Sequence, residues 1–239
     1  MKNETGVSAM VQINQIRDRR TSVERIFDYL NDEINSMRLK PGDRISEAEI
    51  AAKFGVSRQP VRDAFTRLAN HDLLLIRPQR ATEVKKFSPR DVEKSRFVRA
   101  AVEAEILRRA ARRCSVAGAA LLDDCIAEQH EVLKQKDYKA FGALDYAFHE
   151  ALCHVAEADY AFEVISMEKA KVDRLCTLSL SQEDRMPLLV EDHEAIVRAI
   201  KNGDPEAAVD AGMLHLSRLD ATIAQVSKTN ANYFENDLD

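Results

Sequence analysis

Residues 46–69, SEAEIAAKFGVSRQPVRDAFTRLA, predict two short helices joined by a tight turn. Ser46 can cap the first helix, because a serine oxygen accepts a hydrogen bond from a backbone amide of the first turn. Gly55 suits the turn, since glycine adopts a positive φ without steric cost. Ser57 can cap the second helix, and Pro60 falls in its first turn, where a missing N–H does no harm. The stretch therefore predicts a helix-turn-helix.

The second of these helices has an apolar face and a basic face. Apolar residues recur at helical spacing from Val61 to Leu68, which predicts a buried face. The opposite face begins with Arg58, Gln59 and Arg62, and side chains at the amino end of a recognition helix contact base edges. A plain helical corner with a solvated arginine face would show the same spacing. The spacing alone therefore leaves both interpretations open.

The residue order in this region resembles the DNA-binding domain of GntR-family bacterial transcription regulators, over roughly residues 20–86. The residues that carry the resemblance are Leu39-Lys40-Pro41-Gly42, Glu47, Ile50-Ala51, Phe54-Gly55-Val56-Ser57-Arg58-Gln59-Pro60-Val61-Arg62-Asp63-Ala64-Phe65 and Leu68. The resemblance implies a winged helix-turn-helix that binds double-stranded DNA. The residues expected to contact DNA are Arg44, Ser57, Arg58, Gln59, Arg62, Gln79 and Arg80.

Two apolar stretches after the helix-turn-helix, residues 73–76 and 82–84, predict the short strands of the wing, around a basic turn at residues 77–80. Asp72 and Ala81 stand where the family usually has glycine. Aspartate tolerates a left-handed backbone, so the first change is mild. Ala81 argues against a close approach of the wing to the minor groove, and we rank the wing contacts below those of the recognition helix.

Some GntR relatives carry an arginine on the first helix of the helix-turn-helix, where Ala48 stands in this chain. This departure predicts one DNA contact fewer.

From Ser88-Pro89 onward the pattern is wholly helical, since no alternating strand pattern appears after residue 87. Ser88-Pro89 marks the first helix start, because serine caps and proline takes the first helical position. About six helices are expected, with breaks near residues 114–115, 136–137, 157–159, 182–187 and 202–205. The chain is therefore predicted to be mainly α, with an N-terminal winged helix-turn-helix, a small β-wing and a C-terminal all-helical bundle. The expected domains are a mobile arm at 1–20, the DNA-binding domain at 21–87, the metal- and effector-binding domain at 88–228 and a tail at 229–239.

The net charge of −5 hides an asymmetry between the two parts of the chain. Residues 1–86 carry 16 Lys and Arg against 12 Asp and Glu, while the remainder carries 19 against 28. A basic front and an acidic rear suit a DNA-binding head carried by a body that does not bind DNA. The four cysteines lie singly, which predicts reduced thiols. With no bilayer-spanning apolar run, we expect a cytoplasmic protein without membrane contact.

Asp145 and His149 lie four residues apart, on one face of a predicted helix, and His193 and His215 belong to two further helices. One carboxylate and three imidazoles meeting in a bundle would bind a divalent ion such as Zn²⁺, Ni²⁺ or Mn²⁺. A single buried histidine is more often structural than a ligand, so the residues alone leave both possibilities open. The remaining histidines are expected to face solvent or to point away from this face: His71, His130 and His154.

Residues 90–225 resemble the all-helical ligand-binding domain of the FadR-like branch of these regulators, known as the FCD domain. The matching residues are Arg99, Glu103, Asp145, Phe148-His149, Glu191, His193, Ile196, Ala199-Ile200, Gly203-Asp204, Ala207-Ala208 and His215-Leu216. The resemblance implies that Asp145, His149, His193 and His215 bind a metal, with zinc favoured, and that a small organic acid sits against it.

Arg99 and Glu103 have two interpretations. Four residues apart on a helix, they could form a surface ion pair worth about 0.3–0.5 kcal/mol. The resemblance instead places Arg99 inside the bundle, where its guanidinium would clamp an effector carboxylate and Glu103 would hold it in place. Arg174 is a second cationic candidate, for which solvent exposure is expected.

These observations predict a metabolite-responsive DNA-binding regulator, expected to be a repressor and to bind a palindromic operator as a homodimer. An enzyme is not expected. The alternatives from other classes are a metal-dependent hydrolase or lyase that uses the Asp/His₃ group, a direct metal sensor, and a bundle stiffened by a structural metal. The effector can be resolved only as a carboxylate.

Overall fold

The computed structural model describes residues 21–179 and 185–235. The predicted mobile arm, residues 1–20, lies outside this part of the chain. The described residues form two compact units. One runs to Phe87 and also takes in the tail from Tyr233, and the other comprises Ser88–Asn232.

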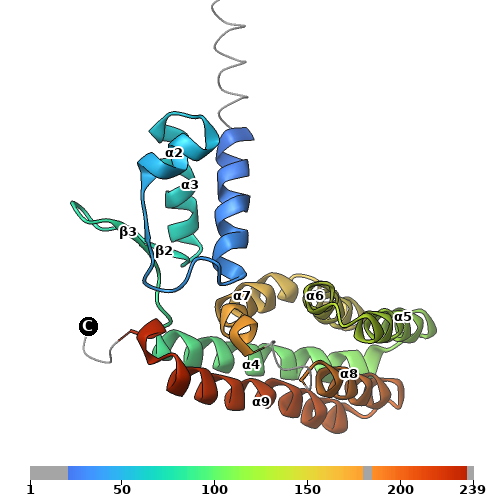
Figure 1. The fold of residues 1–239 in the computed structure, drawn as a ribbon. Helices are drawn as coiled ribbons and strands as arrows, with labels where there is room; N and C mark the ends of the chain where they lie inside the picture. The colour runs from blue at the N-terminus through green and yellow to red at the C-terminus, as the bar shows by residue number, and fades with distance from the viewer. Residues whose placement is uncertain (1–20, 180–184, 236–239) are drawn as a thin grey trace, which may run out of the picture. The chain divides into compact units, whose positions relative to one another are not determined.

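The N-terminal unit is a winged helix-turn-helix (Figure 1). A helix that reaches residue 35 is followed, in chain order, by β1 (Arg44–Ile45), α2 (Glu47–Phe54), α3 (Arg58–Asn70), β2 (Leu74–Leu75) and β3 (Thr82–Val84). The turn between α2 and α3 is made by Gly55 at φ 65°, as its sequence position predicts. Ser46 caps α2, accepting a bond from the Glu49 amide at 3.4 Å. Ser57 takes the cap position of α3, but its side chain makes no capping hydrogen bond.

The wing strands pair with a third strand that the sequence reasoning missed. The antiparallel sheet has the order β1-β3-β2, with Arg44 opposite Glu83 and Leu74 opposite Val84. β1 has only two residues, too few to show an alternating pattern in the sequence. Its register with β3 ties the start of the helix-turn-helix to the base of the wing.

The core of this unit is built from the faces that helical spacing predicts. Val61, Ala64, Phe65 and Leu68 of α3 are at most 1% exposed. They pack with the buried apolar residues of the first helix, Ile26, Phe27, Leu30 and Ile34, and with the inner residues of the sheet. Because the inner face of α3 is fully used in this packing, its basic residues are left on the outer face.

The second unit is a bundle of helices (Figure 1). These are, in chain order, α4 (Pro89–Arg113), α5 (Val116–Gln135), α6 (Tyr138–Val155), α7 (Ala161–Ser179), α8 (Arg185–Lys201) and α9 (Pro205–Thr229), followed by the 3₁₀ turn η1 (Ala231–Tyr233). Four of the five predicted breaks are confirmed. The break predicted at residues 182–187 extends too far, because α8 already begins at Arg185 and takes Pro187 into its first turn, and residues 182–184 lie outside the described part. α4 packs against α7 and α9, α8 packs against α9, and α5 packs against α6.

Local sequence explains where these helices begin. The hydroxyl of Ser88 accepts from the Asp91 amide at 3.2 Å, and the carboxylate of Asp204 accepts from the Ala207 amide at 3.0 Å. Each cap is followed by proline, which suits the first helical position. None of the helices in the described part of the chain is long and apolar enough to span a membrane.

The tail returns to the N-terminal unit. The Phe87 amide donates to the Tyr233 carbonyl, and the Glu235 amide donates to the Phe87 carbonyl, both at 2.9 Å. The rings of Phe87 and Phe234 lie 5.5 Å apart, and both residues are buried. The tail predicted for residues 229–239 is thus ordered through 235, and its last four residues lie outside the described part.

Candidate metal centre and DNA-binding face

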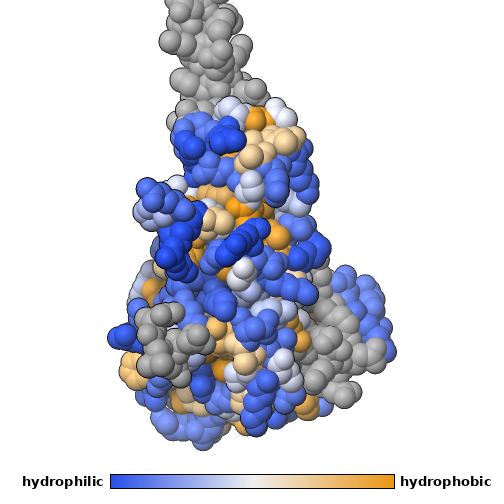
Figure 2. Space-filling model, turned by 60° about the vertical axis from the view of Figure 1, so that its left-hand side comes forward, coloured by the Kyte–Doolittle hydropathy of each residue, from blue (hydrophilic) through white to orange (hydrophobic). Residues whose placement is uncertain are grey.

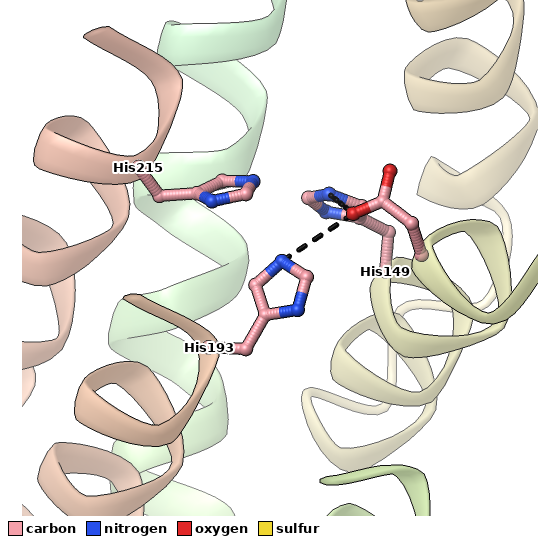
Figure 3. A group of neighbouring side chains, drawn as sticks. His149, His193 and His215 are labelled. Atoms are coloured by element: carbon pink, nitrogen blue, oxygen red, sulfur yellow. Dashed lines mark ion pairs between the residues drawn. The ribbon is translucent and has the colours of Figure 1, made fainter. Parts of the chain in front are cut away.

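The bundle brings the four predicted metal ligands together. Asp145 and His149 come from α6, His193 from α8 and His215 from α9, and all four residues are at most 9% exposed. One ligand atom of each lies within 4.8 Å of those of the other three. The three histidines point toward one another (Figure 3). The i, i+4 spacing on α6 and the packing of α8 and α9 create this convergence.

Each of these side chains has one buried polar atom without a hydrogen-bond partner among the described residues. The atoms are Asp145 Oδ1, His149 Nε2, His193 Nε2 and His215 Nδ1. Asp145 Oδ1 lies 3.4 Å from His193 Nε2 and 4.0 Å from His149 Nε2. Buried polar groups are normally paired, so four such atoms in one place require an explanation. A carboxylate and three imidazoles are ligands that a divalent transition metal accepts.

Two of the imidazoles donate a hydrogen bond through Nδ1 to a buried side chain. His149 Nδ1 donates to Glu103 Oε2 at 3.0 Å, and His193 Nδ1 donates to Gln129 Oε1 at 2.8 Å. A hydrogen bond at Nδ1 fixes the tautomer and leaves Nε2 with its lone pair toward the centre. Gln129 is fully buried, and nothing in the sequence distinguished it from a solvated glutamine.

Burial keeps two of the histidines neutral, as metal ligation requires. Burial lowers the pKa of His193 well below its usual value, and the neighbouring His215 adds to this. Burial likewise lowers the pKa of His215 to about 4, with a further contribution from His149. At neutral pH both rings therefore carry a lone pair that can bind a metal.

Arg99 and Glu103 lie inside the bundle, 7% and 5% exposed, so the surface ion pair is excluded. Arg99 Nε donates to Glu103 Oε1 at 2.8 Å. Burial alone would raise the pKa of Glu103, but its contacts with His149 and Arg99 lower it to about 2. Arg99 Nη2 is buried and has no hydrogen-bond partner among the described residues. Glu103 thus holds Arg99, as expected, and also holds a candidate metal ligand.

Lys169 of α7 was not predicted to belong to this site. It is 7% exposed, and its Nζ lies 2.9 Å from Asp145 Oδ2 and 2.8 Å from Asp173 Oδ1. Burial alone would lower the pKa of Lys169, but the two carboxylates raise it above its usual value. The pKa of Asp145 is well below its usual value, because the charge of Lys169 outweighs the effect of burial. The i, i+4 spacing of Lys169 and Asp173 was the only available signal, and many solvated helices share it.

Two further charged residues of the bundle, Arg174 and Asp192, have buried side chains. Arg174 was expected to be exposed, and this is wrong, because its side chain is only 4% exposed and belongs to the buried face of α7. Asp192, which directly precedes His193, pairs with both Nε and Nη2 of Arg218 at 3.1 Å. Its Oδ2 also lies 3.9 Å from His215 Nδ1.

The remaining histidines and the cysteines lie outside the cluster. His71 and His154 are exposed, and His154 pairs with Asp159 at 3.0 Å. His130 is partly exposed and pairs with Glu194 at 2.7 Å. The described thiols, those of Cys114, Cys125 and Cys153, are free. The side chain of Cys176 is outside the described part.

The residues predicted to contact DNA all lie on the surface of the N-terminal unit: Arg44, Ser57, Arg58, Gln59, Arg62, Gln79 and Arg80. Hydrophilic side chains cover much of the face of this unit seen in Figure 2, with apolar patches between them. Four of the seven come from the start of α3 or its cap, two come from the wing turn and Arg44 comes from β1.

Two of the α3 residues are engaged by neighbouring carboxylates. Arg62 Nε donates to Glu47 Oε2 of α2 at 2.9 Å, and Gln59 Nε2 donates to Asp63 Oδ1 at 2.9 Å. Both pairs are exposed, so they constrain the side chains only weakly.

The wing turn does not need a glycine where Ala81 stands. The positive φ values in this region are at Asp72 (62°) and Gln79 (58°). The expectation that Asp72 tolerates a left-handed backbone is confirmed. Ala81 has no such backbone requirement, so its methyl group costs the turn nothing.

Family models match both units. The model for the FCD domain matches residues 96–218, and the model described as "Bacterial regulatory proteins, gntR family" matches residues 22–84.

Known proteins match most of the chain. The "HTH-type transcriptional repressor RspR" of Escherichia coli (strain K12) is 32% identical over 211 residues, covering 88% of this chain and 92% of that protein. The "Probable D-xylose utilization operon transcriptional repressor" of Paenarthrobacter nicotinovorans is 30% identical over 201 residues, with coverage of 83% and 87%. The solved structure of E. coli McbR/YncC shares the fold, with a TM-score of 0.68, 18% identity and coverage of 85% and 97%.

Proposed function

The chain belongs to the GntR family of bacterial regulatory proteins, with an FCD domain behind its winged helix, and on this premise we propose that a divalent metal and a small carboxylate control its binding to an operator. Its domains and relatives are those of a DNA-binding transcription regulator and not of an enzyme. We place it in the FadR-like branch. We expect a repressor, because two of the similar relatives are named as repressors. We expect it in the cytoplasm, where an operator would be bound.

The observation that carries the proposal is the set of four buried, unpartnered ligand atoms on Asp145, His149, His193 and His215. We assign them a divalent ion, with zinc favoured and nickel or manganese as alternatives, because the set combines nitrogen and oxygen donors. When bound, the ion supplies a Lewis acid with open positions for a ligand oxygen. Glu103 and Gln129 keep two of the imidazoles oriented toward it.

Arg99 supports the choice of a carboxylate effector. Its Nη2 has no hydrogen-bond partner among the described residues, and a guanidinium binds carboxylates through paired N–H groups. A pocket of about 360 Å³ lies against Arg99. Its lining is mixed: it includes the apolar side chains of Val172 and Leu216 and the charged ones of Glu93, Arg96 and Asp220. A small acid could place its charged end near Arg99 and its carbon chain in this pocket.

The outer face of α3 supports the DNA half of the proposal. Arginine matches the two acceptors of guanine, and glutamine matches the donor and acceptor of adenine, so Arg58, Gln59 and Arg62 suit base readout. Ser57, Arg44, Gln79 and Arg80 suit phosphate contacts. A homodimer would present two such faces to the two halves of a palindromic operator. The effector would act by binding one arrangement of the dimer more tightly than another.

The test is a DNA-binding titration on sequences that the protein itself selects from a random pool. The protein is stripped of metal or loaded with zinc, and each form is titrated with a panel of hydroxy-, keto- and sugar acids. We expect at least one acid to change operator affinity of the zinc-loaded protein only. His193→Ala should abolish the response, and His154→Ala, at an exposed histidine, should preserve it.

Two other outcomes would replace the proposal. A switch in operator affinity caused by zinc alone, with no further effect of any acid, would make the protein a direct metal sensor. A rise in melting temperature with zinc but no change in DNA binding would make the metal structural.

A further inference from the structure

Lys169 is enclosed by groups that fix its position. Its ammonium contacts Asp145 and Asp173, and it lies over the ring of Tyr146, 4.3 Å from the ring centroid. The Tyr146 hydroxyl donates to the second oxygen of Asp173. A buried lysine held by two carboxylates and a ring is costly to build.

Asp145 uses its two oxygens for different purposes. Oδ2 faces Lys169, while Oδ1 faces His193 and His149. Lys169 therefore orients Asp145 as a ligand with one available oxygen. It also places a positive charge directly behind the carboxylate that a metal ion would share.

The formal charges of the groups in this contact network do not add up to zero. The carboxylates are Glu103, Asp145, Asp173 and Asp192, and the cations are Arg99, Lys169 and Arg218. With neutral histidines, the network has one excess negative charge. A divalent ion changes this to one excess positive charge, centred on ligand atoms that are buried.

Uncompensated charge in such a site is unfavourable, and an anion with one negative charge removes it. Without Lys169 the same count gives a net charge of zero once a divalent ion binds, and no anion is required. With Lys169 present, the site therefore has zero net charge only when both a divalent metal and a carboxylate are bound.

We propose that Lys169 is a positioning residue that couples metal binding to anion binding, and that the effector brings a single carboxylate to the site. The inference rests on the metal site proposed above. Because coupling between two ligands is reciprocal, the carboxylate increases the affinity for metal by the same factor as the metal increases the affinity for the carboxylate.

The experiment measures zinc affinity of the full chain by competition with a chelating dye, using acetate as the probe. Acetamide, its neutral analogue, is the ligand control, and sodium perchlorate keeps the ionic strength constant. The measured quantity is the acetate factor, the ratio of zinc affinities with and without acetate. In the unsubstituted protein we expect acetate to raise zinc affinity about tenfold and acetamide to leave it unchanged.

The variants form a charge series. Lys169→Met should reduce the acetate factor to about twofold or less, while Lys169→Arg, which keeps the charge, should retain it. Asp173→Asn should increase the factor above that of the unsubstituted protein. The double variant Lys169→Met/Asp173→Asn has the original net charge and should restore the original factor. Lys171→Met, at a partly exposed lysine of the same helix paired with Glu168, should change nothing.

A purely structural lysine would give a different pattern, because the double variant would then be at least as impaired as Lys169→Met. An equal acetate factor in Lys169→Met and in the unsubstituted protein would overturn the inference. Zinc binding without any acetate effect would overturn it as well, while leaving the metal site in place. Should Lys169→Met fail to fold, Asp173→Asn with an unchanged acetate factor would overturn the inference. Absence of zinc binding in the unsubstituted protein would overturn the metal site and the inference together.

Discussion

Glu103 of α4 accepts a hydrogen bond from Nδ1 of His149 of α6 at 3.0 Å, while its other oxygen holds Arg99. One carboxylate thus orients a candidate metal ligand and a candidate effector ligand. The relationship explains why a glutamate is buried in the bundle at 5% exposure. It also links the two halves of the proposed effector site through a single side chain.

Glu103→Gln is expected to weaken zinc binding by about 10- to 100-fold, because a neutral amide holds the imidazole and the guanidinium less strongly than a carboxylate. The measurement is a dye-competition titration of the metal-stripped protein. Glu105→Gln, two residues away and paired with exposed Arg109, is the matched control and should bind zinc normally. Equal zinc affinities for the two variants would show that Glu103 does not support a metal ligand.

Arg62→Ala is expected to weaken specific operator binding by about 1–3 kcal/mol, if the guanidinium reads a base as proposed. Operator and mismatched DNA should be titrated side by side, since loss of a base contact reduces the ratio between them. Arg38→Ala, at an exposed arginine paired with Glu33, is the control. Unchanged operator affinity in Arg62→Ala would remove this residue from the reading surface.

The stability of the metal-free protein should depend on pH through His215. Its pKa is about 4 in the folded protein against an ordinary value of 6.5, so between these values the unfolded chain binds more protons. The free energy of unfolding should therefore fall as pH falls from 6.5 to 4, by about 3 kcal/mol from this group. Urea unfolding at several pH values measures the fall, and His215→Gln should make it smaller. A pH-independent stability over this range would contradict the neutral, buried histidine.

Gly55→Ala is expected to destabilise the N-terminal unit by about 1–2 kcal/mol, because the residue has φ 65° and a Cβ is unfavourable there. Gly142→Ala is the contrasting change, since Gly142 lies within α6 and an added Cβ would meet nothing within 4 Å. That substitution should stabilise the bundle by about 0.5–1 kcal/mol. Thermal unfolding measures both, and destabilisation of similar size in the two variants would contradict the role assigned to the turn.

Much of the fold follows from local sequence. Ser46, Gly55, Ser88-Pro89 and Asp204-Pro205 mark helix ends through capping and backbone preference, which depend on neighbours in the chain. The strand at Arg44–Ile45 was missed because its pairing with β3 is non-local and only two residues long. Local signals do not report such a pairing.

The candidate site was predictable in its ligands but not in its surroundings. Asp145 and His149 share a helix face, and the FCD resemblance supplied the partners on other helices. Lys169 and Gln129 carry no local mark that separates them from solvated side chains, because their roles depend on which face of their helix is buried. Arg174 was misjudged for the same reason, since charge alone predicts exposure and packing overrides it.

The most direct test of the central claim is anomalous diffraction at the zinc edge from crystals grown with zinc. We expect one strong anomalous peak per chain, bounded by Asp145, His149, His193 and His215. A zinc-loaded crystal with no peak between these four side chains would contradict the account.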